Sequence, residues 1–101
     1  MLPVKGVENI DTAELKQMVR KKGKQFIDVR TPGEYKMHHI KQFKNIPLQQ
    51  LAAKSNQLNP EKETVLICQS GMRSMQAARI LKKAGFTKLI NVKGGMNTWR
   101  P

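Results

Sequence analysis

Cys68 is the only cysteine in the sequence and the first candidate for a reactive group. A single cysteine excludes a disulfide within the chain and a metal site built from several thiolates. A lone cysteine is either a small buried apolar residue or a reactive thiol. The thiolate is the nucleophile, and because a free thiol has a pKa near ~8.5, only a small part of it is ionised at neutral pH. The residues around Cys68 therefore decide which description applies.

The six residues after Cys68 are suited to holding an anion beside its sulfur. An apolar run at residues 64–67 predicts a buried strand that ends at the cysteine, and a helical pattern begins near Ser74. A loop that joins a strand to a helix directs backbone N–H groups and the positive end of the helix dipole at one point. Gly71 permits a tight turn, and Arg73 adds a permanent cation. The expected anion-binding loop consists of Gln69, Ser70, Gly71, Met72, Arg73 and Ser74.

Strands and helices alternate along the chain around this loop. A capping box at Asp11 and Glu14 predicts a helix that ends at Gly23. The later elements are a strand at 25–29, a turn at 30–33, a loop-rich stretch, a helix at 48–58, the strand at 64–67, a helix from 74 to a Gly85 cap, and a strand at 88–92. This alternation predicts an α/β domain with a mainly parallel sheet. Ligands of such sheets bind at the carboxyl ends of the strands, which is where Cys68 stands.

Length and composition predict one soluble domain across residues 1–101. No apolar run approaches the ~20 residues of a membrane span, and the start of the sequence lacks the apolar core of a signal peptide. We therefore expect a cytoplasmic protein. The net charge of +12 favours acidic partners, but the basic residues are scattered and the few aromatic residues do not alternate with them. We do not expect nucleic-acid binding.

Three separate motifs resemble those of the rhodanese family. The segment from Cys68 to Ser74 is similar to the family's active-site loop, C-x-S-G-x-R-S. The stretch D-V-R-x-x-x-E-[YF]-x-x-G-H-I-x-G-A-x-N-I-P is matched by Asp28, Val29, Arg30, Glu34, Tyr35, His39, Ile40, Asn45, Ile46 and Pro47. Gly94, Gly95 and Trp99 resemble the closing G-G-x-x-x-W. The motifs occur in the family's order and spacing over nearly the whole chain.

This resemblance implies a rhodanese-like fold, an α/β fold whose five-stranded, mainly parallel sheet carries helices on both faces. It also implies a sulfurtransferase that works in a ping-pong cycle without a cofactor or metal. Cys68 would take sulfur from thiosulfate or a desulfurase persulfide, and pass it as a persulfide to cyanide, a thiol or a sulfur-carrier protein. The main-chain N–H groups of residues 69–73 would hold the persulfide, reinforced by Arg73. We expect a monomer that meets an acidic sulfur-carrier or thioredoxin-like protein as its protein partner.

Other residues near these motifs are given supporting roles. Asp28 is expected to brace the fold, and Arg30 to form an ion pair with Glu34 across the turn. His39 is expected to be buried and hydrogen-bonded rather than a metal ligand, because no acidic or cysteine partner stands at metal-ligand spacing. The Met72 side chain is expected to line the mouth of the pocket.

The chain departs from the family pattern at four positions. His38 and Gln42 stand where the family has glycine, and Phe43 stands where alanine is usual. These three changes put the shape of one connection in question, more than the chemistry. Gln69 is neutral where thiosulfate-preferring members often carry a basic residue, so thiosulfate is expected to be a poor donor.

Two other functions fit parts of the sequence. Cysteine phosphatases and arsenate reductases also place a cysteine and an arginine around an anion-binding loop, but such phosphatases use C-x5-R, which makes room for a tetrahedral oxyanion. Cys68 and Arg73 form the shorter C-x4-R, suited to a single sulfur, and no acid is placed to protonate a leaving group. The second alternative is a rhodanese-fold module that docks partners without turnover, although such domains usually lack the cysteine. Failure to take up sulfur would favour it.

Overall fold

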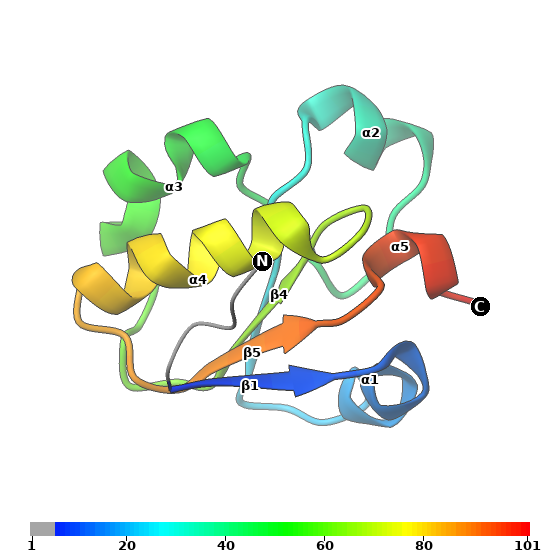
Figure 1. Ribbon diagram of the computed structural model, residues 1–101, viewed down its shortest axis with the longest axis horizontal. Helices are drawn as coiled ribbons and strands as arrows, with labels where there is room; N and C mark the ends of the chain where they lie inside the picture. Colours follow the sequence, from blue (N-terminus) through cyan, green and yellow to red (C-terminus); the bar gives the residue numbers. More distant parts are fainter. Residues whose placement is uncertain (1–5) are drawn as a thin grey trace.

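The computed structural model describes residues 6–101, which fold around one five-stranded sheet (Figure 1). The order across the sheet is β1-β5-β4-β2-β3, and each neighbouring pair of strands is parallel. The strands are β1 (Val7–Ile10), β2 (Gln25–Asp28), β3 (Lys44–Asn45), β4 (Thr64–Ile67) and β5 (Leu89–Val92). Because all of them run in the same direction, their carboxyl ends form one edge of the molecule.

Helices cover both faces of the sheet, which confirms the expected α/β fold. The helices α3 (Leu48–Lys54) and α4 (Met72–Lys83) pack on one face, and α1 (Thr12–Met18) packs on the other. Two short helices, α2 (Pro32–Met37) and α5 (Gly95–Thr98), lie at the end toward which the strands point (Figure 1). A 3-10 turn (Ser55–Gln57) follows α3. In the described part of the chain, no helix has the length and apolar character that crossing a bilayer requires.

The central strand β4 is buried along its whole length. Leu66 packs in one core cluster with Leu81 of α4, while Val65 and Ile67 pack in a second cluster with Leu15 of α1. Successive side chains of a strand point to opposite faces, so a strand covered on both sides must be apolar throughout. The continuous apolar run before Cys68 is therefore the signature of its position in the fold.

The first two predicted helices begin where expected but end earlier than expected. Asp11 accepts a hydrogen bond from the Glu14 N–H (2.8 Å) and Glu14 accepts one from the Asp11 N–H (3.3 Å), so the predicted capping box begins α1. The helix ends at Met18 instead of Gly23, because residues 20–23 are exposed and bury no apolar face that would hold another turn. The helix predicted at 48–58 is likewise shortened to α3 and its 3-10 turn.

Two short helices, α2 and α5, and both edge strands were not predicted from the sequence. Residues 30–33 were expected to form a turn, but Thr31 accepts a hydrogen bond from the Glu34 N–H (3.2 Å) and Glu34 accepts one from the Thr31 N–H (3.0 Å). This second capping box starts α2 at Pro32, where a proline fits because its missing N–H would have no helical partner. The strands β1 and β3 are short and lie at the edges of the sheet.

The departures from the family's glycine and alanine positions cause no backbone strain. His38 has an extended backbone (φ −166°), and no non-glycine residue of the described chain has a positive φ. Phe43 is buried, and its ring centroid lies 5.3 Å from that of Phe26. The larger side chain at this position therefore fills part of the core.

Candidate active site

Cys68 follows the last residue of β4, and its side chain is fully buried. The backbone N–H of Gly71 donates a hydrogen bond to the Cys68 Sγ over 3.0 Å. Gly71 is the N-cap of α4 and has φ +102°, a left-handed conformation that favours glycine. An N–H at this distance, with the positive end of a three-turn helix behind it, stabilises negative charge on the sulfur.

The helix α4 begins at Met72, two residues before the predicted start. Arg73 and Ser74 therefore lie in its first turn rather than in the loop. Met72 was expected at the mouth of the pocket, but its side chain is 58% exposed and does not line the hollow beside the cysteine loop. That hollow is lined by Arg30, Glu34, Met37, His38, Gln69 and Met96.

The backbone of α5 holds the cysteine loop in place. The N–H of Met96 donates to the Cys68 carbonyl and the N–H of Asn97 donates to the Gln69 carbonyl, each over 2.9 Å. A Cβ at Gly95 would lie 2.2 Å from the Cys68 carbonyl oxygen, so only glycine permits this approach. The sequence analysis gave Gly95 no role beyond its place in a motif, and the signal was the glycine pair directly after the last strand.

A chain of polar side chains runs from the sulfur through the buried Ser74 and Asn91 to the exposed Asn9 on the edge strand. The Ser74 Oγ lies 3.4 Å from the Cys68 Sγ and donates a hydrogen bond to the Asn91 Oδ1. The Asn91 Nδ2 in turn donates to the Asn9 Oδ1 over 2.9 Å. Neither asparagine was a predicted site residue, because they lie far from Cys68 in sequence and only the parallel pairing of β1 and β5 brings them together.

The supporting pair of Asp28 and Arg30 is formed, but Arg30 does not pair with Glu34 as expected. The Arg30 Nη2 and Nε donate to the Asp28 carboxylate at 2.8 to 3.1 Å, and the Arg30 backbone N–H donates to it at 3.0 Å. Both side chains are almost completely buried. The prediction failed because the chain folds Arg30 back over the end of β2, while Glu34 starts α2 on the surface. The Arg30 guanidinium also donates to the His38 carbonyl (2.6 Å) and to the Gln69 Oε1 (3.3 Å).

Glu34 instead forms a bidentate ion pair with Arg73. The two guanidinium nitrogens of Arg73 donate to the two carboxylate oxygens over 2.7 and 3.0 Å. The hydrogen bonds from Arg73 are the largest cause that lowers the pKa of Glu34 to about 2. The same hydrogen bonds raise the pKa of Arg73, and the nearby charge of Cys68 acts in the same direction. The charge of Arg73, which was expected to reinforce the anion-binding loop, is therefore already compensated by Glu34.

The other predicted residues occupy the rim. Gln69 lies between Arg30 and Asn97, because its Nε2 also donates to the Asn97 Oδ1 over 2.7 Å. Ser70 is exposed at the tip of the loop. His39 was expected to be buried and is exposed, although its Nδ1 is 2.8 Å from the Tyr35 carbonyl oxygen and its ring stacks on Tyr35. Within residues 6–101, no three side chains of His, Cys, Asp or Glu gather in a way that would hold a metal ion.

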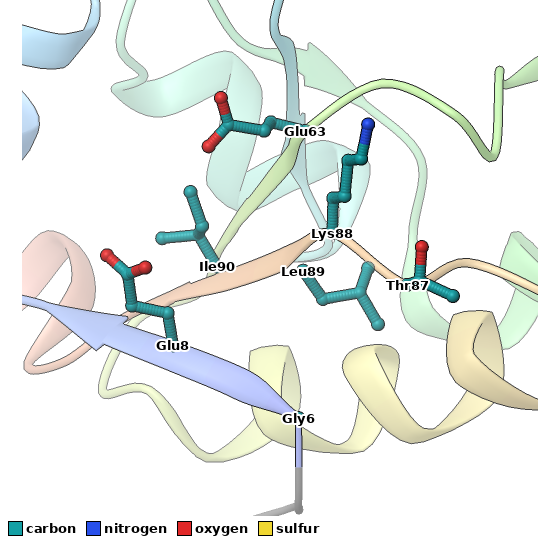
Figure 2. Close-up of a pocket in the computed structure, with 7 residues that line it drawn as sticks. All are labelled: Gly6, Glu8, Glu63, Thr87, Lys88, Leu89 and Ile90. Atoms are coloured by element: carbon teal, nitrogen blue, oxygen red, sulfur yellow. The ribbon is translucent and has the colours of Figure 1, made fainter.

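A second hollow lies at the opposite end of the strands, and it contains no sulfur, histidine or serine side chain (Figure 2). Its lining consists of Gly6, Glu8, Glu63, Thr87, Lys88, Leu89 and Ile90. Lys24 forms an ion pair with Glu63 over 2.7 Å beside it. None of these lining residues belongs to a helix in the described part of the chain, so this hollow has no counterpart of the Gly71 N–H at the start of α4.

Comparisons with known proteins agree with this geometry. Residues 11–101 match the model of the family described as Rhodanese-like domain. The chain is 38% identical over 94 residues to the putative sulfurtransferase YtwF of Bacillus subtilis, covering 92% of this chain and 90% of that protein. It is 47% identical over 73 residues to the putative sulfur carrier protein YrkF of the same organism, covering 72% of this chain and 40% of that one. Several of the curated relatives are longer than this chain, which spans 60%, 40% and 26% of the lengths of three of them.

A solved structure shows the same fold. The crystal structure of a rhodanese-like domain protein from Staphylococcus aureus superimposes with a TM-score of 0.84 at 33% identity, covering 92% of this chain and 91% of the other. The match includes the parallel sheet and the helices on its two faces, which are the elements that place Cys68. The chain is thus a member of the rhodanese-like domain family.

Proposed function

We propose that this chain is a sulfurtransferase that carries sulfane sulfur as a persulfide on Cys68. The observation that supports this most is the contact between the buried Cys68 sulfur and the Gly71 N–H at the start of α4. An anionic sulfur placed there is held by a backbone donor and a helix N-terminus, without a metal. Relatives named as a putative sulfurtransferase and a putative sulfur carrier protein support the same class of chemistry.

The proposed cycle has two displacement steps. In the first, the Cys68 thiolate attacks the outer sulfur of a donor, forming the S–S bond of the Cys68 persulfide while the bond between the two donor sulfurs breaks and its electron pair leaves with the inner group. In the second, a nucleophile attacks the outer sulfur of the Cys68 persulfide, and the Cys68 thiolate leaves. Cyanide would leave as thiocyanate, and a thiol would become a persulfide. The first step raises Cys68 from the thiol to the persulfide oxidation level at the donor's expense, and the second step returns it, so the cycle needs no separate oxidant or reductant.

The persulfide extends the reactive atom by one S–S bond of about 2 Å. We propose that the N–H groups at the beginning of α4 hold this outer sulfur, and that the neighbouring hollow admits the donor and the acceptor. The acceptor class is a thiol, cyanide or a sulfur-carrier protein, for which the high positive charge favours an acidic partner.

Intact-mass measurement of sulfur uptake tests this proposal. The reduced protein is incubated with thiosulfate and, separately, with a cysteine desulfurase and its substrate, and Cys68→Ser is the matched control. The expected result is the addition of one sulfur atom, which cyanide removes and which the variant does not acquire. Absence of uptake from both donors, with Cys68 still open to alkylation, would overturn the proposal and favour a docking module.

A further inference from the structure

Two arginines stand at the access to Cys68, and a carboxylate neutralises each of them. Arg30 is 3% exposed and bound to the fully buried Asp28 through its side chain and its backbone N–H. A buried arginine in such a pair is not available to an incoming anion, because removing it from its carboxylate would leave a buried charge uncompensated.

Arg73 is the more accessible of the two, since its side chain is 34% exposed. Its guanidinium is nevertheless bound by both oxygens of Glu34. Glu34 stays ionised far below neutral pH, with its pKa lowered to about 2 chiefly by the hydrogen bonds from Arg73. A donor that needs Arg73 must compete with a carboxylate that is fixed to the first turn of α2.

The hollow beside the cysteine loop is therefore neutral in a protein of net charge +12. Among its lining side chains, Arg30 is neutralised by Asp28 and Glu34 by Arg73, and Gln69, Met37 and Met96 carry no charge. The sixth, His38, is counted as neutral in the same formal sum that gives +12. Gln69 is also positioned by two neighbours, since its Oε1 accepts from Arg30 and its Nε2 donates to Asn97, and it adds no positive charge just after the cysteine.

The possible donors differ in the charge that this hollow would have to hold. With thiosulfate, the Cys68 thiolate and the dianion carry three negative charges together, and the products, the ionised Cys68 persulfide and sulfite dianion, also carry three. With a protonated thiol persulfide, R–S–SH, the complex carries one negative charge. The thiolate attacks the outer sulfur, R–S⁻ leaves, and the proton of the new Cys68 persulfide passes to it, giving Cys68–S–S⁻ and R–SH. Bringing extra charges out of water is costly where no cation compensates them.

We propose that Glu34 is a specificity-determining residue, which neutralises Arg73 and thereby selects a thiol persulfide over dianionic thiosulfate as the sulfur donor. This inference rests on the sulfurtransferase function proposed above and assigns its donor class. The organic part of the donor would lie against Met37 and Met96, and its charge would be confined to the transferred sulfur.

The substitution Glu34→Gln tests the role of the charge with little change in shape. The glutamine carbonyl oxygen can still accept from the Thr31 N–H, so the start of α2 is retained, while Arg73 loses its counter-charge. The second-order rate constant for sulfur addition to Cys68 is measured by intact mass with thiosulfate and with the persulfide of N-acetylcysteamine, whose organic part is uncharged. In the unmodified protein the persulfide should react faster. In the variant the ratio of the thiosulfate rate constant to the persulfide rate constant should rise about tenfold.

Two further variants separate a local effect from a general one. Glu63→Gln makes the same change in net charge at the opposite end of the sheet, and it should leave the ratio near that of the unmodified protein (Figure 2). The double substitution Glu34→Gln with Arg73→Gln should remove the gain, because the freed cation is then absent.

The outcomes distinguish the two proposals. A ratio that stays constant in a folded Glu34→Gln variant, or that rises as much in Glu63→Gln, would overturn the role of Glu34 while leaving the sulfurtransferase function in place. Failure of both donors to load Cys68 in the unmodified protein would overturn both proposals.

Discussion

Charged side chains are paired differently at the two ends of the parallel sheet. At the carboxyl end, around Cys68, the arginines are held by carboxylates through several hydrogen bonds each. At the amino end, Lys24 and Glu63 share a single contact, and Glu63 is 47% exposed. The hydrogen bond from Lys24 lowers the pKa of Glu63 most, with smaller contributions from the charges of Lys88 and Lys21. Positive charge is thus in excess at one end and balanced at the other.

The difference in charge pairing indicates at which end of the sheet a substitution should disturb several elements at once. In the described residues, no buried side-chain nitrogen or oxygen lacks a hydrogen-bond partner. At the cysteine loop these partners come from β2, α2, α4, β5 and α5, so one change there disturbs several elements. At the amino end the polar groups reach water, and a change should remain local.

The largest expected effect is that of Gly95→Ala at the carboxyl end. A methyl group would lie 2.2 Å from the Cys68 carbonyl, and the backbone has φ +54°, so the cysteine loop or α5 must move. We expect a loss of about 4 kcal/mol or more in the free energy of unfolding, measured by denaturant titration. Gly23→Ala is the matched control, since Gly23 also has a positive φ but no atom within 4 Å, and about 1 kcal/mol is expected there. Equal losses at both positions would show that the close approach does not matter.

The second prediction compares two substitutions, each of which removes one carboxylate from one end of the sheet. Asp28→Ala leaves Arg30 buried without its counter-charge, and we expect a loss of about 3–5 kcal/mol. Glu63→Ala breaks an exposed pair, and about 0–1 kcal/mol is expected. Thermal or denaturant unfolding of both variants gives the difference. A small loss in Asp28→Ala would mean that Arg30 finds water or another acceptor, and the contrast between the ends would disappear.

A smaller effect is expected from Ser74→Ala. The substitution leaves the Asn91 Oδ1 without the hydroxyl donor and removes one contact of the Cys68 sulfur. Loss of one partner from a buried polar pair costs about 1–3 kcal/mol. Stability is measured by denaturant titration, and sulfur uptake by intact mass on the same samples. Asn91→Leu combined with Ser74→Ala should recover part of the loss, because the buried Oδ1 is then absent and Asn9, which loses its Asn91 partner, is exposed to water; a further loss would contradict this explanation.

The smallest expected effect is the loss of stability from the Glu34–Arg73 ion pair at acidic pH. The folded pKa of Glu34, about 2, is below its ordinary value of 4.5, so Glu34 contributes stability above pH 4.5 that is lost as the pH falls toward 2. The stability advantage of the unmodified protein over Glu34→Gln should shrink across this window. Since Glu34 is 34% exposed, the total change should stay within about 1 kcal/mol. Denaturant titrations of both proteins across the acid range measure it, and an advantage that does not depend on pH would exclude the ion pair as its source.

The sequence was sufficient to predict the layers of the fold and the place of the cysteine. The apolar residues of β4 and the helix pattern after Gly71 depend on local rules, namely burial on both faces and tight turning at glycine. The capping box at Thr31 and Glu34 follows the same rule as that at Asp11 and Glu14, but Pro32 and Gly33 favoured the interpretation as a turn. A proline at this position is compatible with a turn and with the first residue of a helix, so the sequence pattern allowed either structure.

The pairing of charges at the site was beyond local rules. Arg30 and Glu34 are four positions apart and oppositely charged, so the sequence favours an ion pair between them. In the structure Arg30 binds Asp28 instead, and Glu34 binds Arg73 from another helix. These partners are selected by the way in which β2, α2 and α4 meet at the edge of the sheet. The neutrality of the access to Cys68 is for this reason a property of the tertiary structure.

The hydrogen bonds between α5 and the cysteine loop also bear on the order in which the site is assembled during synthesis. A chain is made from its amino end, and Cys68 is added well before Gly95, Met96 and Asn97. Until these residues arrive, the carbonyls of Cys68 and Gln69 lack the donors that hold them in the folded protein. The hydrogen bonds that fix the cysteine loop can therefore form only after the residues of α5 have been added.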